Sequence, residues 1–213
     1  MSLISLFSGS HCNEQAVVQN LIDHTGYRLV SDEDVTASAT RLSGLGAGKI
    51  ARAFTGKSSV FNSFTHEKER SIAFLKLALA EMLPADNLIV SGYVSHLIPR
   101  KITHALRVCL IADLKFRSAA AVRPSGGSKK ESAKLVRKQD EAAALWVSAI
   151  GGGSDPWAAS LYDILIPMDK VTPAEAQDII LGQFKQEVLQ PTVESRQAVE
   201  DFLLAANVEV ELA

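Results

Sequence analysis

Short, uninterrupted apolar runs alternate along this chain with longer segments of helical periodicity. Continuous hydrophobicity over four to six residues predicts strands that are covered on both faces, as in a parallel sheet. The predicted strands are Leu3 to Phe7, Asn87 to Val90, Arg107 to Ala112 and Tyr162 to Ile166.

The segments between these runs place apolar residues at helical spacing. Thr172, with proline next and Glu175 three residues on, has the pattern of a capping box, which predicts a helix start. The predicted helices are Glu14 to His24, His66 to Met82, Thr172 to about Leu189, and Val193 to Ala206. Strands alternating with helices indicate an α/β domain with a mostly parallel sheet.

Composition limits the kinds of function. The 213 residues fit one sizeable domain, and 47% hydrophobic with 22% charged residues is typical of a globular protein with a full core. A net charge of −2 gives no reason to expect nucleic acid as a partner. The start has no basic n-region and no apolar run nears the length of a membrane span, so we expect neither secretion nor a membrane partner. Two cysteines and five scattered histidines predict a cytoplasmic protein without a metal site.

One segment stands out by its charge. From Arg117 to Lys138 the chain carries seven basic side chains and one acid, Glu131, around a loop-like centre at 124–128. Such a run is usually a solvated loop. In a chain of negative net charge, it also fits a mobile lid that closes its basic side chains over phosphates.

Two stretches are candidates for a phosphate-binding loop. Gly44 to Lys49, "GLGAGK", lacks the first glycine and the hydroxyl of a Walker loop and follows a helical segment, so we expect a turn there. Ser8 to Asn13, "SGSHCN", follows a buried strand and opens a helix, where free backbone N–H groups favour an anion. It has the right context but no lysine.

Four stretches together resemble the cytidylate kinase-like family, a branch of the P-loop nucleoside monophosphate kinases. One holds a strand ending in Ser91-Gly92 and a second strand followed by Ala-Asp-x-x-x-Arg, and another holds Arg-Lys-x-Asp. The stretches are 59–81, 87–117, 134–146 and 151–180, and the similarity runs from about residue 3 to about residue 182.

The resemblance implies a doubly wound parallel sheet of the P-loop kinase type over residues 1–190, with a C-terminal helical tail at 191–213. It places the phosphate loop at 8–13, a monophosphate-binding segment at about 33–70 and a basic lid at about 113–146. The implied catalytic residues are Arg117, Arg137, Lys138 and Asp140. The implied nucleotide-binding residues of the loop are Ser8, Gly9, Ser10, His11, Cys12 and Asn13. Substrate-binding residues are expected at Lys57, Arg70, Gly92 and Arg100.

The implied reaction is transfer of the γ-phosphoryl group of ATP, with Mg²⁺, to a nucleoside monophosphate such as CMP. Three positions depart from the family pattern: the loop reads His11-Cys12-Asn13-Glu14 in place of glycines, Tyr93 replaces an arginine, and Ala143 replaces another. The alternative hypothesis is therefore a regulatory module that keeps the kinase fold and binds nucleotides without efficient catalysis.

Smaller features leave alternatives open. Cys12, Trp157 and Tyr162 are interpreted as packing residues rather than as a reactive thiol or base-stacking rings. The apolar face of the tail, which includes Val193 and Phe202, either packs on the core or pairs two subunits in a homodimer.

Overall fold

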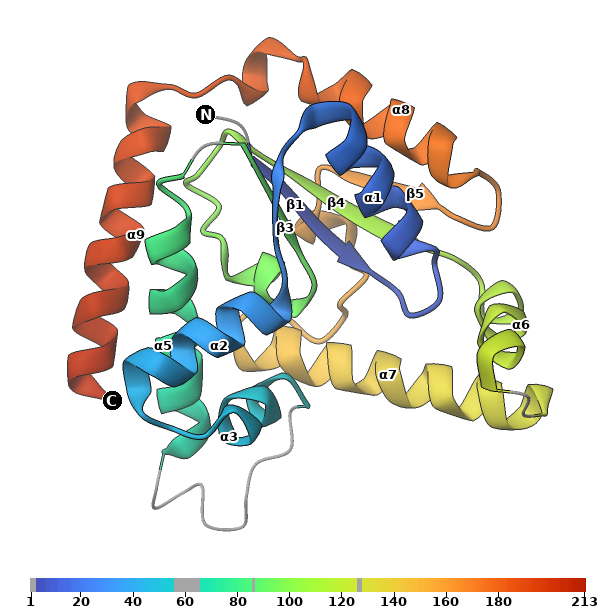
Figure 1. Cartoon of the computed structure of the whole chain (residues 1–213), viewed down its shortest axis with the longest axis horizontal. Coiled ribbons are helices and arrows are strands. Elements are labelled where there is room, and N and C mark those ends of the chain that lie inside the picture. Colours follow the sequence, from blue (N-terminus) through green and yellow to red (C-terminus); the bar gives the residue numbers. More distant parts are fainter. Residues whose placement is uncertain (1–2, 56–65, 86, 126–127) are drawn as a thin grey trace.

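The computed structural model describes residues 3–55, 66–85, 87–125 and 128–213, of which the side chains of 123–125 are left out. Strands and helices alternate along the chain (Figure 1). The strands are β1 (Leu3–Ser8), β2 (Arg28–Val30), β3 (Leu88–Ser91), β4 (Ala105–Ile111) and β5 (Ile164–Pro167). The α-helices are α1 (Glu14–Thr25), α2 (Asp32–Ser43), α3 (Ala47–Arg52), α5 (Glu67–Met82), α6 (Leu114–Ser125), α7 (Lys129–Ala149), α8 (Pro173–Phe184) and α9 (Val193–Leu212). Single 3₁₀ turns are η1 (Ala53–Thr55), η2 (Tyr93–Leu97), η3 (Ala159–Leu161) and η4 (Glu187–Leu189).

The five strands form one parallel sheet in the order β2-β3-β1-β4-β5. The chain leaves β1 toward β2 on one side and later reaches β4 on the other side, so the strand order reverses at β1. In open parallel sheets of this kind, ligands bind beyond the carboxyl ends of the strands at the point of reversal. The sheet thus directs attention to the loop that follows Ser8.

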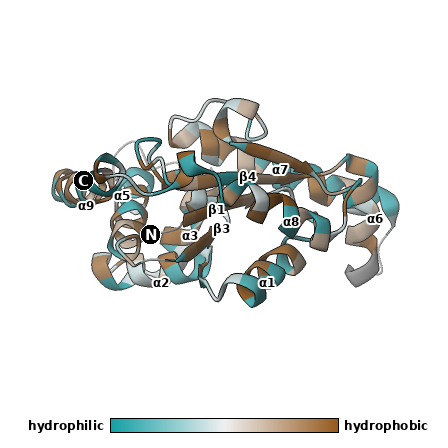
Figure 2. Cartoon of the chain, turned by 90° about the horizontal axis from the view of Figure 1, so that it is seen from above, coloured by the Kyte–Doolittle hydropathy of each residue, from teal (hydrophilic) through white to brown (hydrophobic). Residues whose placement is uncertain are grey.

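Helices cover both faces of the sheet, as the continuous apolar runs predict. On one face α1 and α8 pack over alternate residues of β1 and β4, such as Leu6 and Val108. On the other face α5 packs over β1 and β3, and α9 lies against the outer side of α5. Seen from above, the strands form a mostly hydrophobic layer between these helices (Figure 2).

The tail packs on the core through the face that its sequence pattern identified. Ala198, Val199, Phe202 and Ala206 of α9 are buried in the same cluster as α5. Val193, by contrast, is 81% exposed and does not belong to the packed face.

Several predicted elements differ in extent. The sequence did not predict β2, because only Val30 of its three residues is buried and no apolar run marks it. The predicted helix to Leu189 ends at Phe184 and is followed by η4. The centre of the basic segment, 124–128, was expected to be loop-like, but helix flanks residues 126–127 on both sides. Helix α6 extends to Ser125, and a capping box at Ser128 begins α7.

The stretch Gly44 to Lys49 contains the turn that we expected. Gly44 ends α2 with a left-handed φ of 68°, and its N–H donates to the Thr40 carbonyl. Helix α3 then begins at Ala47, so Lys49 is helical and forms an ion pair with Glu67 at 3.3 Å. The described helices are all too short or too polar to span a bilayer.

Candidate functional site

The loop between β1 and α1 is held in a tight conformation. The N–H of Gly9 donates to the Leu110 carbonyl at 2.8 Å, which fixes the loop to β4. His11 and Asn13 both adopt left-handed backbone conformations, with φ of 62° and 58°. Asn13 is the residue that precedes α1, but its side chain does not cap the helix. The described loop therefore follows a strand and opens a helix, as the sequence predicted for 8–13.

A buried arginine from α6 lies against this loop. Arg117 is only 4% exposed, and its Nε donates to the Ser10 carbonyl at 2.9 Å while Nη2 donates to the Ser10 hydroxyl at 2.9 Å. A Cβ on Gly9 would lie 3.3 Å from the Arg117 Cζ. The absence of a side chain at Gly9 is thus what lets the guanidinium lie this close to the loop.

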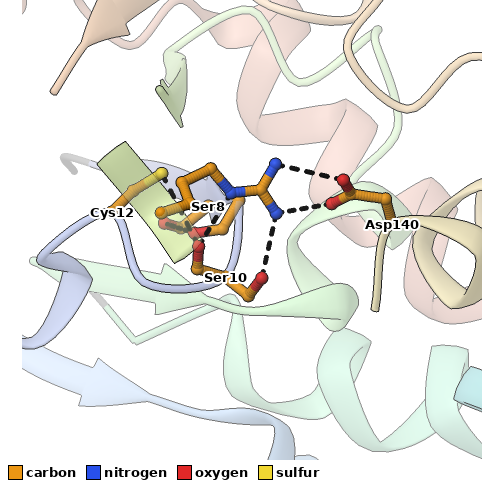
Figure 3. Close-up of polar contacts among 6 residues, drawn as sticks. Ser8, Ser10, Cys12 and Asp140 are labelled. Atoms are coloured by element: carbon orange, nitrogen blue, oxygen red, sulfur yellow. Dashed lines mark hydrogen bonds and ion pairs between the residues drawn. The ribbon is translucent and has the colours of Figure 1, made fainter. Parts of the chain in front are cut away.

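Asp140 of α7 neutralises that arginine from the other side (Figure 3). Its two carboxylate oxygens accept from Nη1 and Nη2 of Arg117 at 3.1 Å and 2.5 Å, in the bidentate geometry that makes arginine–carboxylate pairs strong. The guanidinium also lies 5.7 Å from the ring centre of Trp157. Sequence positions 10, 117, 140 and 157 therefore meet at one point, beyond the end of β1.

A second constellation lies beyond the end of β3. Gly92 has a φ of 105° and a ψ of −160°, which is a conformation essentially restricted to glycine. The Asp32 carboxylate lies directly beside it and accepts the backbone N–H groups of Tyr93 and Val94 at 3.0 Å and 2.9 Å. A Cβ on Gly92 would lie 2.4 Å from the Asp32 Oδ2, so the glycine is required for this contact.

The two constellations line one cavity of about 440 Å³, called here the first cavity. It lies at the carboxyl ends of β1 and β3 and is closed by the starts of α1 and α2, by α7 and by Trp157. Among the residues that the structure describes, the charged side chains that line this cavity are all acidic. These are Glu14, Asp32, Glu33 and Asp140.

Burial favours the protonated form of two of these acids, Asp32 and Glu14. It raises the pKa of Asp32 to about 7, although the two N–H groups that it accepts act in the opposite direction. Burial also raises the pKa of Glu14, whose carboxylate accepts the Ser91 hydroxyl at 2.6 Å. The first cavity therefore carries less negative charge at neutral pH than its four carboxyl groups imply.

Cys12 is a packing residue, as the sequence analysis inferred. Its side chain belongs to the core cluster beneath α1, and burial raises the pKa of the thiol to about 11. A thiol with that pKa is not a thiolate at neutral pH and is a poor nucleophile. Cys109, in the middle of β4, is fully buried in a second cluster with Phe7 and Tyr162.

Some expected site residues do not line the first cavity. Arg137 and Lys138 are exposed on α7, although Gln139 and Asp140 beside them do line it. Arg70 is exposed on α5, where its guanidinium lies 5.9 Å from the ring centre of Phe74. Arg100 lies elsewhere, in a cavity described below.

The remaining expected residues are placed as follows. Gly92 lines the first cavity together with Ser8 and Ser10. His11, Cys12 and Asn13 line another pocket at the start of α1, which shares Glu14 and Gln15 with the first cavity. Lys57 lies outside the described residues. Within the described residues, no group of three or more His, Cys, Asp or Glu could hold a metal ion.

The family model described as "Cytidylate kinase-like family" matches residues 4–170, most of the chain. The chain belongs to the cytidylate kinase-like family. No curated protein matches it.

Two solved structures are similar to this chain. An uncharacterized protein from Eubacterium ventriosum is similar with a TM-score of 0.62 and 16% identity, over 86% of this chain and 97% of that one. A gluconokinase from Sinorhizobium meliloti is similar with a TM-score of 0.46 and 10% identity, over 96% of this chain and 97% of that one. The doubly wound α/β sheet of the P-loop kinase type is thus the fold of this family member.

Sequence reasoning missed Asp32 as a site residue and assigned Trp157 to packing alone. A capping box at Ser31 and Asp34 marks the start of α2, but it gives no sign that Asp32 turns toward Gly92. Trp157 does pack, since its ring stacks on Phe7 at 5.5 Å, and it lines the first cavity as well. The pair Ser91-Gly92 after an apolar strand was the signal that could have located this part of the site.

Proposed function

We propose that this member of the cytidylate kinase-like family binds a nucleotide, with a nucleoside monophosphate such as CMP in the first cavity. The observation that carries the proposal is the position of that cavity, beyond the carboxyl ends of β1 and β3 where the strand order reverses. Its volume of about 440 Å³ is within the usual range for small-molecule sites.

The lining suits the uncharged part of a nucleotide. Carboxylates such as Glu33 and Asp140 accept hydrogen bonds from ribose hydroxyls and from the amino group of a base. Trp157 offers a ring edge or face to the base, and its indole already contacts Phe7. The acidic lining does not suit a phosphate, which therefore has to lie against the β1–α1 loop.

Arg117 is the cation that lies against that loop. Asp140 already neutralises it, and it donates to Ser10 as well, so a phosphate gains its guanidinium only by displacing Asp140 or by sharing it. Because this exchange gives up a bidentate pair, the net attraction for a triphosphate is small. We therefore favour nucleotide binding without fast phosphoryl transfer.

The kinase reaction is the second candidate, and family membership favours it. Phosphoryl transfer from ATP to CMP needs alignment and charge compensation rather than covalent chemistry. Arg137 and Lys138, which immediately precede the cavity residues Gln139 and Asp140 on α7, would have to swing toward the phosphates. Magnesium would arrive on the phosphates of ATP, and Asp140, once released from Arg117, is the carboxylate that could face it.

Calorimetry measures nucleotide binding, which both candidates require. We expect CMP or another nucleoside monophosphate to bind without Mg²⁺, and Trp157→Ala to weaken that binding about tenfold through loss of a stacking surface. Lys101→Gln is the control, because Lys101 is exposed and lines neither the first cavity nor the second cavity described in the next subsection. Trp146→Phe is not a suitable control, because Trp146 is buried.

A coupled assay for ADP then tests turnover. Binding without ADP formation from ATP and CMP selects the non-catalytic module. ADP formation that Arg137→Gln or Lys138→Gln reduces selects the kinase. If no nucleoside monophosphate and no triphosphate binds, with or without Mg²⁺, both candidates are wrong.

A further inference from the structure

A second cavity, of about 300 Å³, lies beneath η2 and shares no lining residue with the first. It is bounded by the segment that follows β3, by the amino-terminal end of β4, and by the end of α7 with the glycine turn after it. Its lining includes Lys76, His96, Arg100 and Arg107.

The charged side chains of this lining are all basic, and none of the lining residues is an acid. Lys76 is already neutralised by Glu209 of α9, whose carboxylate oxygens lie 2.7 Å and 2.8 Å from its Nζ. Burial lowers the pKa of His96 to about 4, so this ring is neutral at pH 7. The excess positive charge therefore comes from the two arginines, Arg100 and Arg107.

Arg107 is a buried cation whose guanidinium donates only to carbonyl oxygens in the described structure. Arg107 is 8% exposed, and its guanidinium donates to the Pro99 carbonyl at 2.7 Å and to the Ala105 carbonyl at 3.0 Å. The nearby Asp163 carboxylate accepts the backbone N–H of Arg107 instead, at 2.7 Å. No ion pair joins the Arg107 guanidinium to a carboxylate of the described residues.

The environment of Arg107 disfavours its charge. Burial lowers the pKa of the guanidinium and the positive charge of Arg100 lowers it further, whereas the negative charge of Asp163 acts in the opposite direction without reversing the shift. A buried cation is normally paired, because an unpaired charge away from water is costly. An anion between the two arginines would remove this cost, and Arg100, which is exposed and donates to the Ser160 carbonyl, leaves an approach from solvent.

Much of the remaining wall is apolar, and part of it is closely packed. Leu97, Val147, Ile150 and Leu161 supply hydrophobic surface. The glycine turn brings the backbone near α7, since a Cβ on Gly152 would lie 2.8 Å from the Val147 Cγ1. A ligand of this cavity is therefore small, with an anionic group at the arginines and a short carbon skeleton against the leucines.

We propose that the second cavity binds a small molecule with a phosphate group, held by the guanidinium groups of Arg100 and Arg107. A phosphate is favoured over a carboxylate because two guanidinium groups that form no ion pair with a described carboxylate match a dianion, and because arginine binds phosphate oxygens in a bidentate manner. The proposal does not depend on nucleotide binding in the first cavity, since the two linings are separate.

The test is calorimetry at low ionic strength with inorganic phosphate, glycerol phosphate and acetate as probes. We expect both phosphate probes to bind, glycerol phosphate more tightly, and acetate at least tenfold more weakly. Arg100→Gln changes an exposed side chain and so leaves the fold intact, and it should weaken phosphate binding tenfold or more by loss of a charge-assisted hydrogen bond. Glu209→Gln frees Lys76 and should strengthen binding severalfold.

Lys101→Gln is the matched control, because Lys101 is exposed, adjacent in sequence and lines neither cavity. It should change the affinity less than twofold. An equal loss in Lys101→Gln and Arg100→Gln would show a diffuse charge effect and overturn the proposal. So would acetate binding as tight as phosphate, a failure of both phosphate probes to bind at millimolar concentration, or a loss of binding in Arg137→Gln that Arg100→Gln does not share.

Discussion

The two cavities of this protein carry opposite charge. The first is lined by four acids and no base, and the second by three bases and no acid, within the residues that the structure describes. Both lie beside the same ring, because Phe7 lines the first cavity and contacts His96 of the second at 4.3 Å between ring centres. A thin aromatic wall thus separates a site suited to hydroxyl and amino groups from a site suited to an anion.

The difference lies in how each charge is balanced. In the first cavity three of the four acids have partners within the chain: Asp140 has Arg117, Asp32 has two backbone N–H groups, and Glu14 has Ser91. In the second, the Arg107 guanidinium has carbonyl oxygens but no carboxylate in the described structure. Charges that are balanced within the chain serve to hold the fold, so a ligand of the first cavity must be bound mainly through its uncharged groups. A buried cation without an ion pair indicates a place where an anion can bind.

The largest expected effect comes from Gly92→Ala, which breaks the first cavity. A Cβ at this position collides with Asp32, and the backbone conformation is unfavourable for any other residue. Displacement of Asp32 also leaves two N–H groups without their acceptor. We expect a loss of about 3 kcal/mol or more in the free energy of unfolding, measured with chemical denaturant.

Gly48→Ala is the control for that change. Gly48 lies within α3 and has open space around the position of a Cβ, so alanine there should be neutral or stabilise the protein by up to about 1 kcal/mol. Equal stability of the two variants would contradict the role of Gly92 in holding Asp32.

The next prediction compares the loss in the free energy of unfolding at an arginine that has an ion pair, Arg117, with the loss at one that has none in the described structure, Arg100. Asp140→Asn leaves the buried Arg117 without its counter-charge and should cost about 3 kcal/mol, because breaking a buried pair strands the remaining charge. Arg100→Gln in the second cavity removes an exposed charge that forms no ion pair with a described carboxylate and should cost less than about 1 kcal/mol. Glu141→Gln, at an exposed neighbouring position on α7, is the control for the first variant. Similar losses for Asp140→Asn and Arg100→Gln would remove the distinction between the two cavities.

The smallest effect is a change in pH dependence. The folded protein raises the pKa of Asp32 from 3.8 to about 7, so between these values the folded state binds a proton that the unfolded state has released. The favourable contribution is present at acid pH and is lost as the pH rises through 7. From pH 6 to pH 8 the loss attributable to Asp32 is about 1 kcal/mol.

Asp32→Asn should flatten this part of the stability profile. Glu33 and Glu14 are the acids whose charge also acts on Asp32, and both remain in the variant. Denaturation curves at several pH values measure the slope. An unchanged slope in the variant would show that Asp32 does not titrate in this range.

The sequence predicted the sheet because buried parallel strands leave a clear apolar signature, as in Leu3 to Phe7. Through family resemblance it also assigned Arg117 and Asp140 to one catalytic region, and these two side chains do meet in the structure. That residues 8–13 bind phosphate stays a prediction. The sequence could not predict that Arg117 would be buried and neutralised, since that depends on α6 and α7 converging at Ser10. Asp32 was missed for the same reason: its partner amides lie about sixty residues away in sequence.

The second cavity was not predicted because its charges are scattered along the chain. Arg100 was expected beside a substrate, but the structure has it beneath η2 with Arg107, which looked like an ordinary strand residue. An arginine at the start of an apolar strand gives no sign of lacking a counter-charge. Only the structure shows that the Arg107 guanidinium donates to the carbonyl groups of Pro99 and Ala105.

The ion pair between Lys76 and Glu209 has a consequence for comparing members of this family. Glu209 lies in α9, beyond residue 170 where the family match ends, yet it sets the charge at the wall of a cavity built from residues 5–162. A relative that shares the matched region but lacks this helix would have one more unneutralised cation there. Affinity for anions should therefore vary among relatives with a segment that an alignment of the shared domain leaves out.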